Sequence, residues 1–258
     1  MPGFKPFNPI KLAFKTEKIV TRDGEEGQER KYTSFYSVPV YRGIATGYAV
    51  GCCLRCFYCW SGPSRDFPER YGDFYSPLQA FRRIEEAAKK GIQYGRWRFL
   101  TISKARVSGC EPTISREHLL KLLEYVEYSD FELFILETNG ILIGWDKSYA
   151  RDIAKFSKVH VRVSIKAGTP SGFTWRTGAI GKFYELPFKA VKHLLDAGVS
   201  CHAAAMTDPR IMSEKERRTI IDKLAEIDMR IAANLEEEVI DFYDMTIFRL
   251  KKAGVFKF

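Results

Sequence analysis

Short apolar runs alternate along the chain with segments whose apolar residues recur every three or four positions. The run Val159–Ile165 is rich in β-branched residues and predicts a buried strand. The segment Pro77–Lys90 has helical spacing and is followed by Gly91, a residue type that commonly ends helices. Further strands are predicted over Ala45–Val50, Trp97–Val107, Phe131–Leu136, Val199–Met206 and Met229–Leu235. Further helices are predicted over Ser115–Glu127, Ser148–Phe156, Glu185–Ala197, Ser213–Ile227 and Asp241–Ala253.

From Gly47 onward these elements form about six units, each a strand followed by a helix. Such alternation implies an α/β fold with a parallel sheet whose apolar strands are buried on both faces. An open doubly wound sheet and a partial barrel both satisfy the pattern. In either architecture, functional residues gather at the carboxyl ends of the strands.

The N-terminal part of the chain departs from this pattern. Lys15–Thr21 and Arg30–Val40 have strand-like composition and flank the charged, turn-like segment Arg22–Gly27, which predicts a hairpin with a long loop. We therefore expect an N-terminal β extension over 1–44 and a core domain over 45–258 that ends in a helix. The extension is expected to be a lid over one end of the core, or an arm that binds a partner.

Composition is that of an ordinary globular protein. Apolar residues make up 45% and charged residues 28%, which argues against disorder and against a coiled coil. No uncharged apolar stretch reaches 18 residues and no secretory signal is apparent, so we expect a cytoplasmic protein with no membrane partner. The net charge of +9 suits RNA or another anionic partner, although Lys and Arg interleaved with Glu are more typical of solvated faces.

The six cysteines carry more information. Four of them lie within eight residues, which is too close together for a framework of disulfides between distant segments. Cys52, Cys56 and Cys59 form a C-x3-C-x2-C pattern that can hold three corners of an iron–sulfur cube. A competing frame begins at Cys53. A structural zinc site or a group of inert buried thiols would also account for this clustering.

This motif, placed on the loop after the first strand of an α/β repeat, resembles that of the radical S-adenosylmethionine (radical SAM) enzymes. Tyr58 stands at the aromatic position that precedes the last cysteine in that family. The resemblance implies that Cys52, Cys56 and Cys59 hold a [4Fe–4S] cluster whose fourth iron is chelated by S-adenosylmethionine. It also implies a partial (β/α)6 TIM-like barrel.

Two later segments resemble companion motifs of the family. Gly109 and Glu111 lie in a segment like the family's G-G-E-P, which receives the methionyl ammonium group; Cys110 stands where the family usually has glycine. Cys110 is either a small buried residue or an extra thiol near the cofactor.

The string Glu137, Thr138, Asn139 and Gly140 is similar to one in activating-enzyme-type members, where polar side chains face the cofactor. Turn chemistry alone would explain Asn139 and Gly140, but not Glu137 and Thr138.

Ser164 and Lys166 share one face of the fourth strand because side chains alternate along a strand. In relatives, residues at this spacing contact the ribose hydroxyls and the carboxylate of the cofactor. Lys166 could instead form a structural ion pair, and Arg162 is a candidate second contact to an anion.

The loop 169–178, with its Trp, Arg and Thr residues, is a candidate substrate site at the same edge. Candidate lining residues on the last two strands are His202, Met206, Asn234, Glu236 and Glu238. For His202 the alternative is a satisfied core residue, and for the acidic residues an exposed cap.

The resemblance implies an enzyme that reductively cleaves S-adenosylmethionine to a 5′-deoxyadenosyl radical, which abstracts hydrogen from a substrate. Its electron donor would be a low-potential protein of the flavodoxin or ferredoxin type. The substrate is either a partner protein that receives the radical, or RNA or an anionic metabolite. A non-catalytic iron–sulfur or zinc-binding electron-transfer module remains the alternative.

Overall fold

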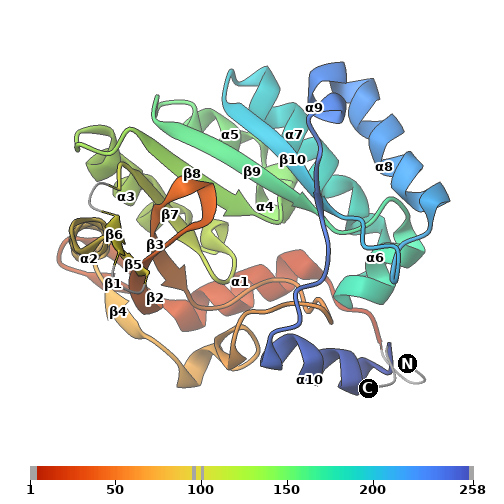
Figure 1. The fold of residues 1–258 in the computed structure, drawn as a ribbon, viewed down its shortest axis with the longest axis horizontal. Coiled ribbons are helices and arrows are strands. Elements are labelled where there is room, and N and C mark those ends of the chain that lie inside the picture. Colours follow the sequence, from red (N-terminus) through yellow and green to blue (C-terminus); the bar gives the residue numbers. More distant parts are fainter. Residues whose placement is uncertain (1–4, 95–96, 100–101, 256–258) are drawn as a thin grey trace.

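The computed structural model describes residues 5–94, 97–99 and 102–255, and its main feature is one large, mostly parallel sheet (Figure 1). Neighbouring strands follow the order β1-β2-β3-β7-β8-β9-β10-β11, and β4 pairs with β2. The strands are β1 (Thr21–Gly24), β2 (Gly27–Val38), β3 (Ile44–Ala49), β4 (Asp73–Tyr75), β7 (Lys104–Ser108), β8 (Leu133–Thr138), β9 (Val159–Ile165), β10 (Ser200–Met206) and β11 (Glu236–Glu238). From β3 to β11 each neighbouring pair is parallel, and β11 does not pair back to β1. The predicted partial barrel is confirmed.

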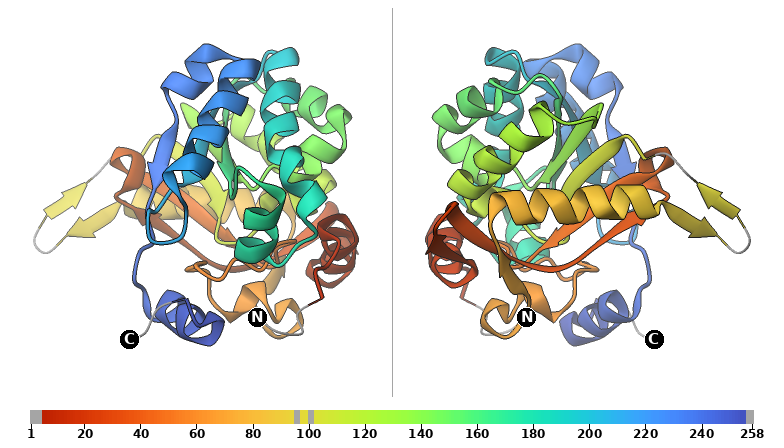
Figure 2. Two further views of the ribbon diagram at one scale, coloured as in Figure 1. Left: turned by 90° about the vertical axis from the view of Figure 1, so that its right-hand side faces the viewer. Right: turned by 90° about the vertical axis from the view of Figure 1, so that its left-hand side faces the viewer.

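Helices cover the outer face of this sheet (Figure 2). The helices in the described part of the chain are α1 (Pro9–Val20), α2 (Pro77–Lys90), α3 (Arg116–Glu127), α4 (Ile141–Trp145), α5 (Lys147–Ile153), α6 (Pro170–Thr177), α7 (Leu186–Asp196), α8 (Glu214–Ile227), α9 (Met229–Ala233) and α10 (Asp244–Ala253). Of these, α10 lies apart from the helices that cover the sheet (Figure 2). No helix in the described part of the chain is long and apolar enough to cross a membrane.

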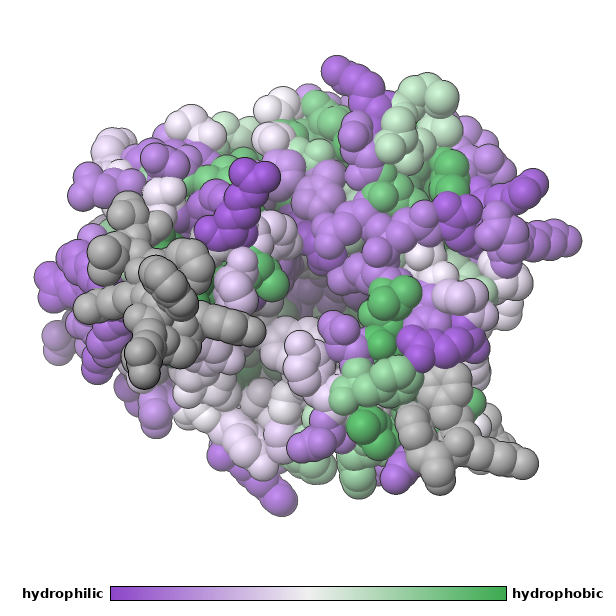
Figure 3. Space-filling view, in the orientation of Figure 1, coloured by the Kyte–Doolittle hydropathy of each residue, from purple (hydrophilic) through white to green (hydrophobic). Residues whose placement is uncertain are grey.

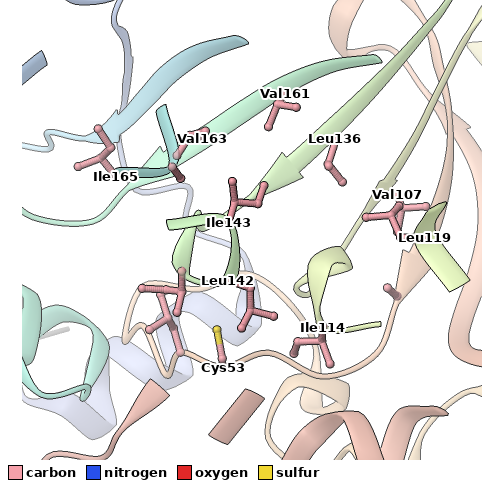
Figure 4. Packing of buried hydrophobic residues seen from close by; sticks show 14 of the residues in the cluster. Cys53, Val107, Ile114, Leu119, Leu136, Leu142, Ile143, Val161, Val163 and Ile165 are labelled. Atoms are coloured by element: carbon pink, nitrogen blue, oxygen red, sulfur yellow. The ribbon is translucent and has the colours of Figure 1, made fainter. Parts of the chain in front are cut away.

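The two faces of the sheet differ in polarity. Val161 and Val163 of β9 are fully buried on the face that packs against the helices (Figure 4). The alternating residues Arg162 and Ser164 face the barrel interior. Strand register places Glu137 of β8 opposite Arg162 and therefore on the same inner face. The barrel interior is thus polar, and Figure 3 shows a hollow near the middle of this view with hydrophilic residues beside it.

The N-terminal extension differs from its prediction. Lys15–Thr21, predicted as a strand, lies almost wholly in helix α1. The side chain of Asn8 caps this helix by accepting hydrogen bonds from the backbone of Ile10 and Lys11. The hairpin is present, but β1 and β2 form it, and β2 also pairs with β3 and so extends the core sheet.

Two other strand predictions were partly wrong. Met229–Leu235 contains the short helix α9, which begins at the N-cap Asp228, and the last strand is β11. The predicted strand Trp97–Val107 is divided between β6 (Trp97–Phe99), which pairs with β5 (Ile92–Tyr94) in a separate hairpin, and β7. Residues 100–101 lie outside the described residues. Apolar periodicity detects an extended run but not the point at which it changes partner.

A buried histidine links the N-terminal hairpin to α3. His118 Nδ1 lies 2.9 Å from the carbonyl oxygen of Gln28 and can only donate to it, so Nε2 accepts from the Tyr32 hydroxyl at 2.9 Å. This arrangement fixes a neutral imidazole, and burial lowers the pKa of His118 to about 3.

The free energy of unfolding should therefore fall as pH drops below the unfolded-state pKa of His118, about 6.5. Between that pH and about 3 the unfolded chain binds a proton that the folded chain does not. The loss between pH 6.5 and 5 is expected to be about 2 kcal/mol. Urea unfolding of the iron-free protein at both pH values measures it. His118→Gln should remove this part of the pH dependence, and equal pH dependence in both proteins would contradict the assignment.

Candidate active site

The cysteine loop, residues 51–62, follows β3 at the carboxyl edge of the parallel strands. Cys52 and Cys59 are half-buried, and Cys56 is buried. Cys53 is fully buried and lies in the apolar core, near Ile114 and Leu142 (Figure 4). Cys53 therefore lies deeper than the neighbouring Cys52, although the two thiols are close enough to hydrogen-bond.

The thiols lie in an environment of positive charge and hydrogen-bond donors. Burial raises the pKa of Cys56 to about 11, although the ammonium group of Lys166 and the guanidinium of Arg65 oppose that rise. A hydrogen bond from Cys53 lowers the pKa of Cys52 to about 7. Cys110 lies close enough to Cys52 for their charges to interact, and burial raises its pKa to about 12.

Helix α6 fixes the cysteine loop from one side. The backbone N–H groups of Arg55 and Phe57 donate to the carbonyl oxygens of Thr177 and Arg176, at 2.9 and 3.1 Å. The ring of Trp175 packs edge-on against that of Phe57, with centroids 4.8 Å apart. The segment 169–178, predicted as a substrate loop, is therefore mostly a helix that supports the cysteine loop.

Glu111 connects three strand-end segments. Its buried carboxylate accepts hydrogen bonds from the hydroxyls of Thr113 (2.6 Å) and Thr138 (2.7 Å), and from the backbone N–H groups of Thr113 (3.1 Å) and Asn139 (2.8 Å). Its own N–H donates to the carbonyl oxygen of Gly51 at 3.0 Å. Glu111 therefore joins the G-G-E-P-like segment to the end of β8 and to the start of the cysteine loop.

The backbone at position 109 requires a glycine. Its φ is +90°, and an added Cβ would lie 3.3 Å from the carbonyl oxygen of Ala49. Its carbonyl oxygen accepts a hydrogen bond from the Ser61 hydroxyl. The neighbouring Cys110 can replace the family's usual glycine because the positive φ falls on Gly109.

Asn139 combines the turn role with a contact to sulfur. Its Oδ1 accepts from the N–H of Ile141 at 3.0 Å, and its Nδ2 lies 3.3 Å from Cys53 Sγ and 3.8 Å from Cys52 Sγ. Asn139 therefore takes part in the turn and also places a polar side chain beside the cysteine loop. Gly140 adopts φ +72° where the chain turns into α4.

Glu137 belongs to the barrel interior. It accepts from Arg106 at 2.6 Å, Tyr41 at 2.9 Å and Ser108 at 2.6 Å. Burial alone would raise its pKa, but the charges of Arg106 and Arg162 and these hydrogen bonds hold it below its usual range. Alternation along the second strand could have identified Arg106 as an inner residue; no sequence signal pointed to Tyr41.

Ser164 and Lys166 are brought together as predicted. Lys166 Nζ lies 2.5 Å from Ser164 Oγ, and Lys166 is close enough to Cys56 to influence its pKa. Arg162 has other partners: it donates twice to Glu236 at 2.9 Å and once to Glu238 at 2.7 Å.

The remaining candidate lining residues do not all belong to the interior. His202 Nε2 lies 3.0 Å from Glu236 and its Nδ1 lies 2.7 Å from His160, so His202 is part of the interior network. Asn234 instead donates to the carbonyl oxygen of Arg230 at the end of α9. Met206 is buried on β10.

Comparison with known families decides the class. The family model described as the radical SAM superfamily matches residues 48–224, more than half of the chain. The chain belongs to the radical SAM superfamily. It is an enzyme of this class, and the family uses a [4Fe–4S] cluster and S-adenosylmethionine. No curated protein matches the sequence.

Solved structures share the fold at low identity. anSMEcpe with bound S-adenosylmethionine is 18% identical with a TM-score of 0.52, over 74% of this chain and 49% of that one. SuiB from Streptococcus suis, bound to its precursor peptide SuiA, is 16% identical with a TM-score of 0.56, over 86% and 43%. A cysteine-to-alanine mutant of spore photoproduct lyase is 12% identical with a TM-score of 0.54, over 79% and 58%. This radical SAM chain therefore spans about half the length of the structures that it matches.

The residues at the site suit the family's cofactors. Three thiols lie on one loop beside cationic side chains, and among the residues that the structure describes the buried Tyr58 hydroxyl has no hydrogen-bonded oxygen or nitrogen partner. Within the described residues, no three His, Cys, Asp or Glu side chains converge on one point, as a structural zinc ion requires. An iron–sulfur cluster spreads its cysteine ligands over separate irons, so it does not need that convergence.

Proposed function

We propose that this enzyme cleaves S-adenosylmethionine reductively and uses the resulting radical to abstract hydrogen from a polar, peptide-like substrate in the barrel interior. The bound cluster and S-adenosylmethionine supply the electron and the 5′-deoxyadenosyl radical. The observation that carries the proposal is the position of the cysteine loop at the carboxyl edge of six parallel strands within the described residues. Lys166, directly after β9, lies close enough to Cys56 to influence its pKa.

Cys52, Cys56 and Cys59 are the proposed cluster ligands. Cys53 has the adjacent position in sequence, but its sulfur is enclosed by the core and contacts Asn139. The burial of Cys53 supports the frame that begins at Cys52. The half-buried Cys52 and Cys59 remain open to a group that binds at the strand ends.

The residues around this loop are proposed to hold S-adenosylmethionine in separate roles. Lys166 attracts the carboxylate, and Ser164 bonds a ribose hydroxyl. The proposed contacts on the ammonium side and around the sulfonium are Tyr58, Gly109, Glu111, Glu137, Thr138 and Asn139. Because four donors already hold the Glu111 carboxylate, its part is to keep these segments in place and to add negative charge near the ammonium.

The charge of the interior selects the substrate class. Its two arginines, Arg106 and Arg162, face three carboxylates, those of Glu137, Glu236 and Glu238. Lys104 and Lys166 lie on the same inner face, so the positive and negative charges nearly cancel. The interior therefore lacks the strong positive field that favours binding of a phosphate-rich substrate such as RNA. The overall charge of +9 therefore belongs to the exterior, where it favours docking of an acidic electron donor of the flavodoxin or ferredoxin type. A peptide segment suits this polar interior, whose charges are largely paired.

Calorimetric titration of the anaerobically reconstituted protein with S-adenosylmethionine tests this function. We expect saturable binding and, with dithionite, formation of 5′-deoxyadenosine. A protein that holds iron and sulfide but binds no S-adenosylmethionine would instead be the electron-transfer module.

Lys166→Met should weaken S-adenosylmethionine binding about 10- to 100-fold, because a hydrogen bond to a charged group contributes about 1.5–3 kcal/mol. The same titration measures the loss. Lys189→Met removes an exposed lysine from α7 and should leave the affinity unchanged. If the affinity is unchanged in Lys166→Met, Lys166 does not contact S-adenosylmethionine and its role is limited to the hydrogen bond with Ser164.

A further inference from the structure

Each cysteine of the C-x3-C-x2-C motif has its backbone carbonyl held by the Nη1 of a different arginine. The pairs are Arg55 with Cys52 at 2.7 Å, Arg65 with Cys56 at 2.6 Å, and Arg249 with Cys59. The guanidinium groups of Arg65 and Arg249 are buried, with 7% and 6% of their side chains exposed. The arrangement fixes the backbone at all three proposed ligand positions.

One carboxylate joins these three arginines. Asp66 lies 3.4 Å from Arg55 Nε, 2.8 Å from Arg65 Nη2 and 2.8 Å from Arg249 Nη2. Burial would raise the pKa of Asp66, but the guanidinium groups of Arg65 and Arg249 lower it below its usual value. We call Asp66 and the three arginines the Asp66 brace.

Arg249 reaches the loop from the C-terminal helix α10. Besides Cys59, it donates to the carbonyl oxygens of Ser61 and Gly62. Figure 2 shows α10 apart from the helices that cover the sheet, beside the segment that follows the cysteine loop. Arg249 also lies beyond residues 48–224, which match the family model. The helix therefore lies outside the matched core, and the Arg249 side chain connects it directly to the cysteine loop.

We propose that the Asp66 brace is a positioning device for the cluster, in which Arg249 makes α10 part of the active site. It acts in two ways: it holds the cysteine loop in shape before iron enters, and it sets the charge around the cluster. The second of these roles, on the charge around the cluster, rests on the proposed function; the first does not.

The energetics support both parts. Buried charges are costly unless well paired, and removing one partner of a buried pair is strongly destabilising, so loss of Arg249 should loosen the loop. Three guanidinium groups and one carboxylate leave a net charge of +2 beside the loop. Reduction adds an electron to the cluster, so this positive charge favours the reduced state and raises the midpoint potential.

Hydrogen exchange of the iron-free protein tests the first part. The N–H groups of Arg55 and Phe57 are bonded to α6, so their exchange reports opening of the loop. Arg249→Gln and Asp66→Asn should each speed exchange in peptides from 52–62, by roughly tenfold for loss of one charge-assisted bond. Arg249→Lys should restore part of the protection. Lys252→Gln removes an exposed charge from the same helix and should have no effect.

The midpoint potential of the reconstituted protein tests the second part. Arg249→Gln should lower the potential and Asp66→Asn should raise it, whereas Lys252→Gln should match the unchanged protein. A purely structural role would not give shifts of opposite sign. Wild-type exchange and wild-type potential in Arg249→Gln would overturn the proposal. If the unchanged protein took up no cluster, the proposed function would fail, while the exchange data would still decide whether the brace holds the loop.

Discussion

Replacing Cys52, Cys56 or Cys59 with alanine should abolish both the absorbance of the [4Fe–4S] cluster and 5′-deoxyadenosine formation. We propose that each thiolate holds one corner of the cluster, and we expect no other cysteine on the loop to take its place. Cys53 is the obvious substitute for Cys52, but its sulfur lies in the core, fully buried and close to Asn139 Nδ2. The expected result is complete loss of activity in all three variants after anaerobic reconstitution.

Cys53→Ala is the matched control. Removing one buried sulfur leaves a small cavity that costs about 1 kcal/mol, and the cluster and its activity should remain. The reverse pattern, with the cluster retained in Cys52→Ala and lost in Cys53→Ala, would assign the first ligand to Cys53. Iron and sulfide content, measured beside absorbance, separates loss of the cluster from loss of activity alone.

Glu111→Gln should lower the free energy of unfolding by about 3 kcal/mol. The amide has one oxygen in place of two, so its NH2 group meets the backbone N–H of Asn139 where the carboxylate accepted a hydrogen bond. The fully buried guanidinium of Arg30, which donates to the Glu111 carbonyl oxygen at 2.9 Å, also loses a nearby negative charge. For a chain of this size we expect a fall of roughly 6–12 °C in Tm.

The iron-free protein is suitable for this measurement, because the Glu111 contacts lie within the chain itself. Glu124→Gln removes an exposed carboxylate from α3 that pairs with Lys121, and its effect should stay within about 0.5 kcal/mol. Equal melting of Glu111→Gln and Glu124→Gln would show that the carboxylate does not connect the three strand-end segments.

Several features of the fold follow directly from the sequence. The β-branched run Val159–Ile165 and the helical spacing of Pro77–Lys90 identify their elements with the bounds that the structure has. Alternation of strands and helices predicts the parallel sheet, and the sheet then brings the strand-end motifs to one edge. The approach of Lys166 to Cys56 could therefore be predicted from topology and side-chain alternation alone.

Other features depend on contacts that no local pattern encodes. Lys15–Thr21 has strand-like composition, but capping by Asn8 and burial of Ile10 and Ala13 against the core make it part of a helix. Met229–Leu235 resembles a strand until Asp228 caps a helix within it. Tertiary packing and capping outweigh the propensity of short segments in both places.

The Asp66 brace could not be predicted from the sequence either, because Asp66 and Arg249 are distant in sequence and neither lies in a recognisable motif. The net charge of +9 is a different case, because it does not say where the charges lie. On the inner face Arg162 is paired with Glu236 and Glu238. Only strand register shows which charges share the interior.

Electron paramagnetic resonance of the reduced, iron-loaded protein tests the central claim most directly. If one iron of a three-cysteine cluster binds S-adenosylmethionine, adding this ligand in the absence of oxygen should change the g-values of the reduced cluster. Lys166→Met should need more ligand for the same change. A fully loaded cluster whose spectrum stays the same at saturating S-adenosylmethionine would contradict the account.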